Sequence, residues 1–359
     1  MEERPDVVPE RPRRSGTRVA AGLVTTAAAV VAVAVLPRLV GAGWHEVAAA
    51  VAGVGAGQLV LLVLVWAAGL LVCAGVLTAS LAGLSRRRAV LLNLSGSAVA
   101  SALPFGGAVG VWLNSLMLRR WRFSGRDVAS FTITSNGVDL VGKFAVALPA
   151  LAIALGTGGM PRLPHAEGWS IALGSSVLAG ALVVVAAGTS RGLRTLSGAL
   201  ASADRLLARS PRRASAPRVA AQWFLGLDEV RTTVLARVRA EWPRLTFGVL
   251  GYVALQGLLF VLCLRAAGVH SAATVVLAAF ALDRVASSVP LTPSGTGMAE
   301  AAACAVLIGA GAPAVPVLTG VLLYRFLIVV LEVPVGGIAL GGWLLAHRGD
   351  RSGDGRGLR

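Results

Sequence analysis

Long apolar stretches alternate with short polar or basic connections along most of the chain. A helix needs about 20 consecutive apolar residues to cross roughly 30 Å of hydrocarbon, and several uncharged stretches of this sequence approach that length. The pattern predicts an all-α, polytopic membrane helix bundle. We expect six full spans, at residues 18–37, 57–81, 127–157, 169–188, 245–266 and 314–346.

Two further apolar stretches, 89–118 and 271–311, are interrupted by Pro and Gly. The first has basic clusters on both flanks, and the second lies between two uncharged turns. Because the two flanks of each stretch are alike, we expect two re-entrant, broken-helix hairpins that enter from opposite surfaces. We place their turns at Pro104–Gly107 and Pro290–Gly297. Irregular backbone is tolerated inside a membrane only where protein or a polar cavity surrounds it.

The two breaks also share sequence. The residues Val-Ala-Ser at 99–101 precede Pro104 with the same spacing with which those at 285–287 precede Pro290. Opposed hairpins of similar sequence are what an inverted-topology repeat leaves behind, and in transporters such repeats place the binding site near the bilayer midplane. Chance similarity between segments rich in Ala, Val and Ser is the alternative.

The composition supports a membrane protein and indicates its orientation. The 359-residue chain is 56% hydrophobic and only 14% charged, against roughly 25% charged residues in soluble domains. Its net charge of +16 is concentrated in the two tails, in the clusters 85–88 and 119–127, and in the segment 189–244. Such Arg-rich connections are cytoplasmic and can hold anionic lipid headgroups. We expect membrane lipids as partners, and no nucleic acid, because no folded basic domain is present.

The domain organisation follows from these patterns. We expect a disordered basic cytoplasmic tail at 1–17, a single transmembrane domain at 18–346 and a disordered cytoplasmic tail at 347–359. Within the domain, the basic segment 189–244 predicts amphipathic helices along the cytoplasmic surface, since about 55 residues are too few for most separate catalytic domains. The excess of Arg over Lys is typical of a GC-rich bacterial genome. The expected location is therefore a bacterial cytoplasmic membrane, with both termini inside.

A polar stripe marks the predicted span 127–157. Thr132, Asn136, Asp139 and Lys143 recur at offsets that place them on one helical face, and Asp139 and Lys143 can pair directly. A charge at the centre of a membrane helix costs roughly 2.5–3.5 kcal/mol on insertion scales. Two interpretations are open: an ion pair that only holds helices together, or a stripe that lines a polar substrate path.

The second half concentrates polar and ionisable residues around its break. Arg325 and Glu332 are seven residues apart and are expected to share a helical face. With Asp139 and Lys143, the charged members form a nearly balanced set, which fits a compensating network with either a structural or a functional role. The second-half residues of this group are Asp283, Arg284, Glu300, Tyr324, Arg325 and Glu332.

The breaks themselves are candidate anion sites. A Gly/Ser/Thr turn that leads into a helix offers free backbone N–H groups and the positive end of the helix dipole, which suits a phosphate. Arg284 or Arg325 could add charge. The alternative is a plain kink that lets helices pack closely. The turn residues assigned to substrate binding are Pro104, Gly106, Gly107, Pro290, Pro293, Ser294, Gly295 and Gly297.

Catalytic signals are weak. The sequence contains no Gly-x-Ser-x-Gly elbow, no P-loop and no aspartate pair spaced for a metal–diphosphate site. Its four histidines lack metal-ligand spacing, and Cys73, Cys263 and Cys304 are scattered through apolar segments. We therefore expect no catalytic residues, no metal and no cofactor, and enzymatic activity is not favoured.

Three stretches of the chain carry a family resemblance. LNLSGSAVASALPFGGAVG, DRVASSVPLTPSGTGMAEAAACAVLIGAG and LLYRFLIVVLEVPVGG resemble the lysylphosphatidylglycerol synthase transmembrane-region family, which is similar to the flippase half of MprF-type proteins. The resemblance covers most of the chain. In the second half, the residues that match the family's Pro/Gly–Gly–Glu run and downstream Arg are Pro290, Pro293, Gly295, Gly297, Glu300, Tyr324 and Arg325.

The first half departs from the family pattern. Many members carry a Gly-Glu pair and a following Arg, whereas this chain has Gly106-Gly107, Ala108 and Asn114 there. We do not expect the soluble aminoacyl-transfer domain of the full-length synthases. The resemblance implies a flippase or transporter of a phosphate-bearing lipid or lipid-linked precursor. Two alternatives stay open: a membrane-embedded enzyme or accessory factor in glycolipid or cell-envelope synthesis, and a scaffold that recruits partners through 189–244.

Overall fold

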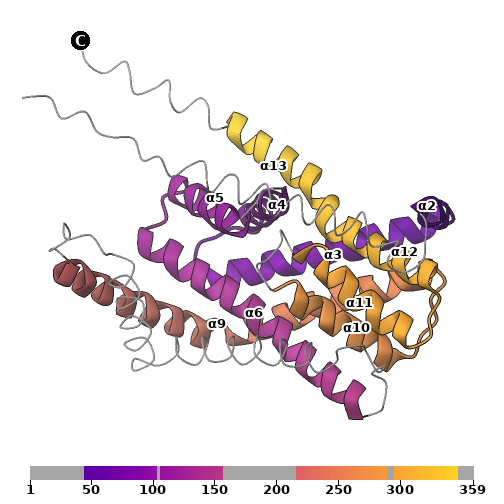
Figure 1. Cartoon of the computed structure of the whole chain (residues 1–359). Coiled ribbons are helices and arrows are strands. Elements are labelled where there is room, and N and C mark those ends of the chain that lie inside the picture. Colours follow the sequence, from indigo (N-terminus) through magenta and orange to yellow (C-terminus); the bar gives the residue numbers. More distant parts are fainter. Residues whose placement is uncertain (1–43, 103–105, 157–215, 289–294, 347–359) are drawn as a thin grey trace, which may run out of the picture.

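The computed structural model describes residues 44–102, 106–156, 216–288 and 295–346, and every element in them is a helix (Figure 1). The all-α prediction is confirmed for these residues. The predicted spans 18–37 and 169–188 lie outside them. The helices are α2 (Trp44–Ala52), α3 (Ala56–Ser80), α4 (Arg86–Ala102), α5 (Gly106–Arg120), α6 (Gly125–Gly156), α9 (Ala216–Ala266), α10 (Ala273–Ala286), α11 (Met298–Gly309), α12 (Ala314–Arg325), the π-helical segment η2 (Phe326–Val330) and α13 (Glu332–Ala346).

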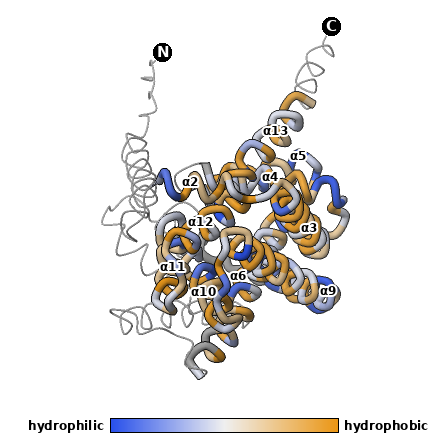
Figure 2. Tube along the Cα trace, turned by 90° about the vertical axis from the view of Figure 1, so that its right-hand side faces the viewer, coloured by the Kyte–Doolittle hydropathy of each residue, from blue (hydrophilic) through white to orange (hydrophobic). Residues whose placement is uncertain are grey.

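Three helical stretches among the described residues are long and apolar enough to cross a membrane: Ala56–Ser80, Glu229–Ala266 and Ala314–Ala346. The 32-residue α6 is long enough as well, but its polar stripe sets it apart from these three. Large apolar side chains point outward, for instance Val60 and Leu64 of α3, which are 59% and 61% exposed. Figure 2 shows apolar residues along nearly all of the described helices. An apolar outer surface of this kind is suited to lipid rather than water.

One predicted boundary does not coincide with the end of a helix. We expected a surface segment to end at residue 244 and a separate span to start at 245, but 216–266 form the single helix α9, of 51 residues, which continues through Pro243. Such a helix is about 77 Å long, more than twice the thickness of the hydrocarbon layer. The helix packs against α3 and α6.

Two contacts fix the position of the first half of α9. The Arg237 guanidinium donates a 2.9 Å hydrogen bond from Nε to the carbonyl oxygen of Ala79, near the end of α3. Arg126, at the start of α6, forms an ion pair with Glu229. The end of α3, the start of α6 and residues 229–237 of α9 therefore lie at one end of the bundle, which we call the basic end.

Helices α4 and α5 form a hairpin that opens toward the basic end. The Arg88 guanidinium lies 5.1 Å from the centre of the Trp121 ring, and Arg120 lies 5.7 Å from that of Trp343. These contacts bring the start of α4, the end of α5 and the last turns of α13 together. At 17 and 15 residues, the two helices rise only about 26 and 23 Å, which is less than the roughly 30 Å of hydrocarbon.

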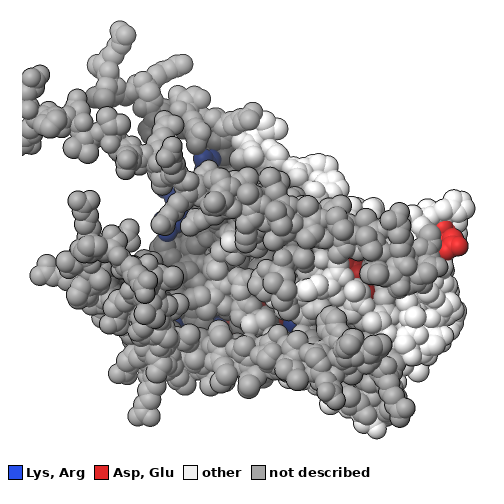
Figure 3. All heavy atoms as spheres, viewed as in Figure 1, with Lys and Arg blue, Asp and Glu red and all other residues white. Residues whose placement is uncertain are grey.

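Helices α10 and α11 form a second hairpin with the opposite orientation. Because α9 starts at the basic end, its last residue and the start of α10 lie at the far end of the bundle, where α11 also joins α12. The connections at that end, 53–55, 267–272 and 310–313, contain no Lys, Arg, Asp or Glu. Figure 1 shows the two hairpins reaching the middle from opposite ends, and the described surface over α11 and α12 in Figure 3 is mostly uncharged.

The two hairpins are fastened differently to the rest of the bundle. The first packs on α13 through a very close approach of backbones, since a Cβ atom at Gly336 would lie 2.1 Å from the carbonyl oxygen of Leu94. The second is buried in the largest hydrophobic core of the described residues, where the ring of Phe280 on α10 packs against that of Phe260 on α9 with their centres 5.7 Å apart. The α4–α5 hairpin is thus held by close packing at small residues, and the α10–α11 hairpin by aromatic packing.

Candidate functional site: a charge-lined cavity between the hairpins

A cavity of about 410 Å³ lies between the two hairpins. Its wall is made by α4 and α5 on one side, by α10 and α12 on another, and by α3, α6, α9 and the start of α13 between them. Seven of the residues assigned to substrate binding from sequence line it: Gly107, Asn136, Asp139, Lys143, Arg284, Arg325 and Glu332.

A buried cluster of four charged residues supports the cavity wall on the side of the second hairpin. Asp283, which has no exposed surface, accepts hydrogen bonds from both neighbouring arginines. Its Oδ2 lies 2.6 Å from Nη2 of Arg284, and its Oδ1 lies 2.8 Å from Nη2 of Arg325. Two guanidinium groups therefore share one carboxylate, which satisfies the rule that buried charges must be paired.

Glu300 completes this four-charge cluster. One of its carboxylate oxygens lies 3.3 Å from Nε of Arg325, and the other accepts a 2.7 Å hydrogen bond from the backbone N–H of Gly297, at the start of α11. We expected that N–H group to be available to a bound anion. It is occupied by the protein's own carboxylate, and the cluster of Asp283, Arg284, Glu300 and Arg325 is balanced at zero net charge.

The second break requires glycine at two positions. Gly295 and Gly297 have φ angles of 67° and 92°, in the left-handed region that side chains disfavour. A Cβ atom at Gly295 would also lie 2.5 Å from Cα of Ser287. Both glycines shape the turn that places Glu300 next to Arg325. Pro104, Pro290, Pro293 and Ser294, which were also assigned to substrate binding, lie outside the described residues.

Arg284 faces the cavity from between aromatic rings. Its guanidinium lies 5.5 Å from the centre of the Phe280 ring and 5.6 Å from that of Tyr324, distances at which cation–π attraction acts. It also donates from Nη1 to the Gln256 amide oxygen at 2.5 Å, and Gln256 donates to the Tyr252 hydroxyl at 2.6 Å. Tyr324 itself is fully buried behind the wall, as are Asp283 and Glu300.

The polar stripe of α6 forms another side of the cavity. Thr132, Asn136, Asp139 and Lys143 all line it, so the predicted shared face is confirmed. Lys143 Nζ lies 2.8 Å from Oδ2 of Asp139, and these side chains are 24% and 43% exposed. Both partners of this ion pair face the cavity, whereas the carboxylates that hold Arg284 and Arg325 lie behind the wall.

Glu332 stands apart from the other charges. We expected it to share a helical face and a network with Arg325. Both residues line the cavity, but Arg325 pairs with Asp283 and Glu300 and not with Glu332. The Glu332 side chain instead lines a side pocket together with Trp66 and Asn93. The prediction of a single compensating network is therefore wrong. The seven charges divide into the four-charge cluster, the Asp139–Lys143 pair and Glu332.

The two glycines of the first break have different surroundings. A Cβ atom at Gly106 would lie 2.1 Å from the carbonyl oxygen of Ala100, across the hairpin. A Cβ atom at Gly107 would have no neighbour within 4 Å, and this residue lines the cavity. Gly106 thus lets the two arms of the hairpin meet, while Gly107 leaves space open.

Several polar residues of the wall were missed by the sequence analysis. A signal was available, because Asn93 and Ser97, like Tyr252 and Gln256, are polar pairs four residues apart within apolar helices and so share a helical face. Asn114 and Ser135 line the cavity as well. Together these residues make the wall rich in amide and hydroxyl groups.

Apolar helices around a charged internal cavity define a multi-pass integral membrane protein. Comparison of sequences identifies the family: the pattern described as lysylphosphatidylglycerol synthase TM region matches residues 19–336. The chain belongs to this family, as its motifs indicated. A search among curated proteins gives no match.

Proposed function

We propose that this protein is a flippase or transporter that carries a phosphate-bearing lipid, or a lipid-linked precursor, across a bacterial cytoplasmic membrane. The observation that carries the proposal is the cavity of about 410 Å³, lined by Lys143, Arg284, Arg325, Asp139 and Glu332, inside a bundle with an apolar exterior. Its size is in the range of ligand pockets, roughly 300–1,000 Å³. A headgroup would enter the cavity while its acyl chains stay in the lipid.

Lys143 is the cation best placed to meet a phosphate. Lys143, Arg284 and Arg325 are the cations among the described residues that line the cavity. Of these three, only Lys143 has a carboxylate partner, Asp139, that also lines the cavity. A phosphate that enters the cavity can therefore replace Asp139 as the partner of Lys143, while cavity water hydrates the Asp139 carboxylate. Arg284 and Arg325 are held from behind by buried Asp283, so they supply a fixed positive wall. The amide and hydroxyl side chains would bind the hydroxyl groups of a headgroup.

In the same proposal, the hairpins α4–α5 and α10–α11 are re-entrant segments of an inverted repeat, and the basic end of the bundle is cytoplasmic. Each hairpin is shorter than the hydrocarbon layer and the two point in opposite directions, which supports this arrangement. Irregular backbone at the two breaks is then shielded by protein and by the cavity.

Cysteine accessibility tests the topology. In a chain whose three native cysteines are replaced by alanine, Arg87→Cys and Arg119→Cys should react with a membrane-impermeant maleimide from the cytoplasmic side only, because both residues are exposed at the ends of one hairpin. His270→Cys and Ala310→Cys should react only from the outside. Labelling of Arg87→Cys and Arg119→Cys from different sides would refute the re-entrant hairpin.

Lipid movement tests the function. The full chain in proteoliposomes should expose fluorescent phosphatidylglycerol or phosphatidylethanolamine to dithionite faster than empty vesicles do. Gly107→Leu should reduce this rate about tenfold, equivalent to about 1.4 kcal/mol in the barrier, because Gly107 lines the cavity and a Cβ atom there has open space around it, so the larger side chain fills cavity space.

Gly342→Leu is the matched control, since a Cβ atom there also has open space and the residue does not line the cavity. It should keep the wild-type rate. Equal rates for Gly107→Leu and the wild type would show that headgroups do not use this cavity. No movement of any lipid class by the wild type would remove the proposed function and leave the enzyme and scaffold alternatives.

A further inference from the structure

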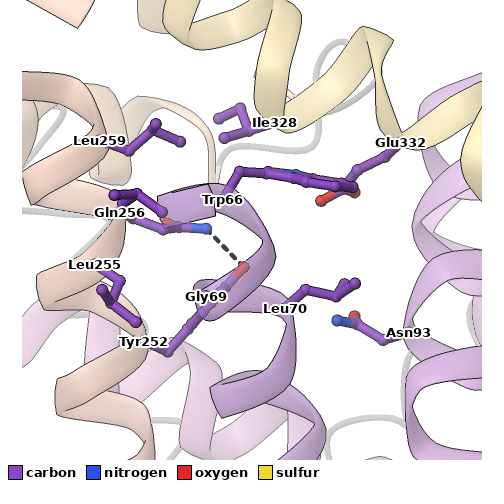
Figure 4. A pocket seen from close by; sticks show the side chains of 11 residues that line it. Trp66, Gly69, Leu70, Asn93, Tyr252, Leu255, Gln256, Leu259, Ile328 and Glu332 are labelled. Atoms are coloured by element: carbon purple, nitrogen blue, oxygen red, sulfur yellow. Dashed lines mark hydrogen bonds between the residues drawn. The ribbon is translucent and has the colours of Figure 1, made fainter. Parts of the chain in front are cut away.

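We infer that Glu332 is a reversible proton-binding site at the edge of the cavity. Beside its carboxylate lies a side pocket of about 20 Å³, which is room for about one water molecule. Figure 4 shows the Trp66 side chain lying next to Glu332, with Asn93 on a neighbouring helix and Tyr252 and Gln256 across the pocket. The other residues that line the pocket are apolar residues of α3, α9 and η2.

Charge balance is the first argument. No Lys or Arg in the described part of the chain forms an ion pair with Glu332, whereas the other six charges assigned to the site are all paired. An ionised carboxylate without a counter-charge is costly inside a membrane protein. A proton on the carboxylate removes that charge without any other change in the cavity.

The groups that face Glu332 from neighbouring helices do not supply the missing charge. Lys143 on α6 is held by Asp139, and Arg284 on α10 is held by Asp283 and Gln256. Arg325, one π-helical turn before Glu332, is held by Asp283 and Glu300. The remaining titratable neighbours are Cys73 on α3 and Tyr252 on α9, and both are neutral in their ordinary form.

The donors around the pocket favour a proton over a metal cation. A sodium ion needs a shell of several oxygen ligands, but Trp66 offers only an N–H group. The Gln256 amide oxygen already accepts from Arg284, and the Tyr252 hydroxyl already accepts from Gln256. Glu332 and Asn93 are too few to complete such a shell, whereas a single O–H bond needs no further ligand.

Water can reach the site through the cavity. The side pocket and the cavity share Asn93, Tyr252, Gln256, Ile328 and Glu332 in their walls, and Glu332 lies near the middle of the span Ala314–Ala346. A proton from cavity water forms an O–H bond on a carboxylate oxygen, and the same bond breaks when the proton returns to water. No oxidant or further reactant is involved.

The site itself does not depend on lipid transport, but a role for its proton as the coupling ion rests on the proposed function. Such a role gives the two states of the cavity different net charges, one with Glu332 ionised and one with it neutral. The rate of lipid movement should then depend on pH in the wild type.

Infrared spectroscopy tests the site without any transported lipid. In difference spectra of the full chain in nanodiscs, titrated between acid and alkaline pH, we expect the carbonyl stretch of a protonated carboxyl group to appear and disappear. Glu332→Gln should remove this band, and the matched variant Asp139→Asn should keep it. Trp66→Phe should keep the band but move it to higher wavenumber, because an apolar ring replaces the polar indole beside Glu332.

Each outcome decides the matter. A band that is absent in the wild type, or unchanged in both Glu332→Gln and Trp66→Phe, overturns the proposal. A band that is suppressed when sodium replaces choline at constant pH identifies a sodium site instead, and also overturns it. A band lost in Glu332→Gln upholds the site even if no lipid moves, in which case only the proposed function fails. If lipid moves but the wild type shows no such band, the proposed function stands and the proton-binding site fails.

Discussion

Asp283→Asn should be the most destabilising single substitution in the described part of the chain. Asp283 is fully buried and is the carboxylate shared by Arg284 and Arg325. Asparagine keeps the shape but removes the charge, which leaves buried Arg325 with Glu300 as its carboxylate partner and buried Arg284 with no carboxylate partner in the cluster. Breaking a buried ion pair by removing one partner costs about 3–5 kcal/mol of the free energy of unfolding. Thermal denaturation of the purified protein in detergent measures this loss.

Asp139→Asn is the control for that experiment. It also removes an Asp from an ion pair on an apolar helix, but the Asp139 side chain is 43% exposed and its partner Lys143 is 24% exposed. Partly exposed pairs contribute about 0–1 kcal/mol, so the denaturation temperature should change little. Similar losses in the two variants would mean that the four-charge cluster does not hold the second hairpin in place.

Gly106→Ala should destabilise the protein and Gly107→Ala should not, although they change neighbouring residues in the same way. The Cβ atom of Ala at position 106 would meet the carbonyl oxygen and carbon of Ala100 at 2.1 and 2.5 Å. Backbone atoms cannot rotate away, so the arms of the α4–α5 hairpin must separate. Overpacking of this kind costs about 1–3 kcal/mol.

Gly107→Ala meets no atom within 4 Å and should leave the denaturation temperature within about 2 °C of the wild type. It also shows that position 107 tolerates a side chain, which the Gly107→Leu transport experiment requires. A large loss of stability in Gly107→Ala would mean that the first break is packed differently. Equal stability of Gly106→Ala and the wild type would have the same meaning.

The hairpins could be predicted because their signals are local. Pro and Gly interrupt an apolar stretch at each break, whereas the sidedness expected from the like flanks of each stretch stays a prediction. The α6 stripe was predictable for the same reason, since helical periodicity alone places Asp139 and Lys143 together. The helix boundaries agree with the predicted positions of the two breaks. Helix α4 ends before residues 103–105 and α5 starts after them, and α10 and α11 lie on either side of 289–294.

The partners of the buried charges could not be predicted, because they depend on contacts between distant helices. The composition predicted a nearly balanced set of charges. It did not predict that Asp283 forms ion pairs with both Arg284 and Arg325, while Glu332 forms an ion pair with neither. The continuity of α9 was missed for a related reason, because packing against α3 and α6 overrides both Pro243 and the basic character of its first half.

The π-helical segment determines which way each charge faces. Its turn, closed by the hydrogen bond from the Leu331 N–H to the Phe326 carbonyl oxygen at 2.8 Å, contains one residue more than an α-helical turn. If 326–330 were wound as an ordinary helix, everything after it would rotate by about 100°, and Glu332 would swing away from Trp66 while Arg325 stayed with Asp283. The extra residue thus acts as an angular spacer, and its loss or migration would turn Glu332 away from the side pocket without altering a single charge.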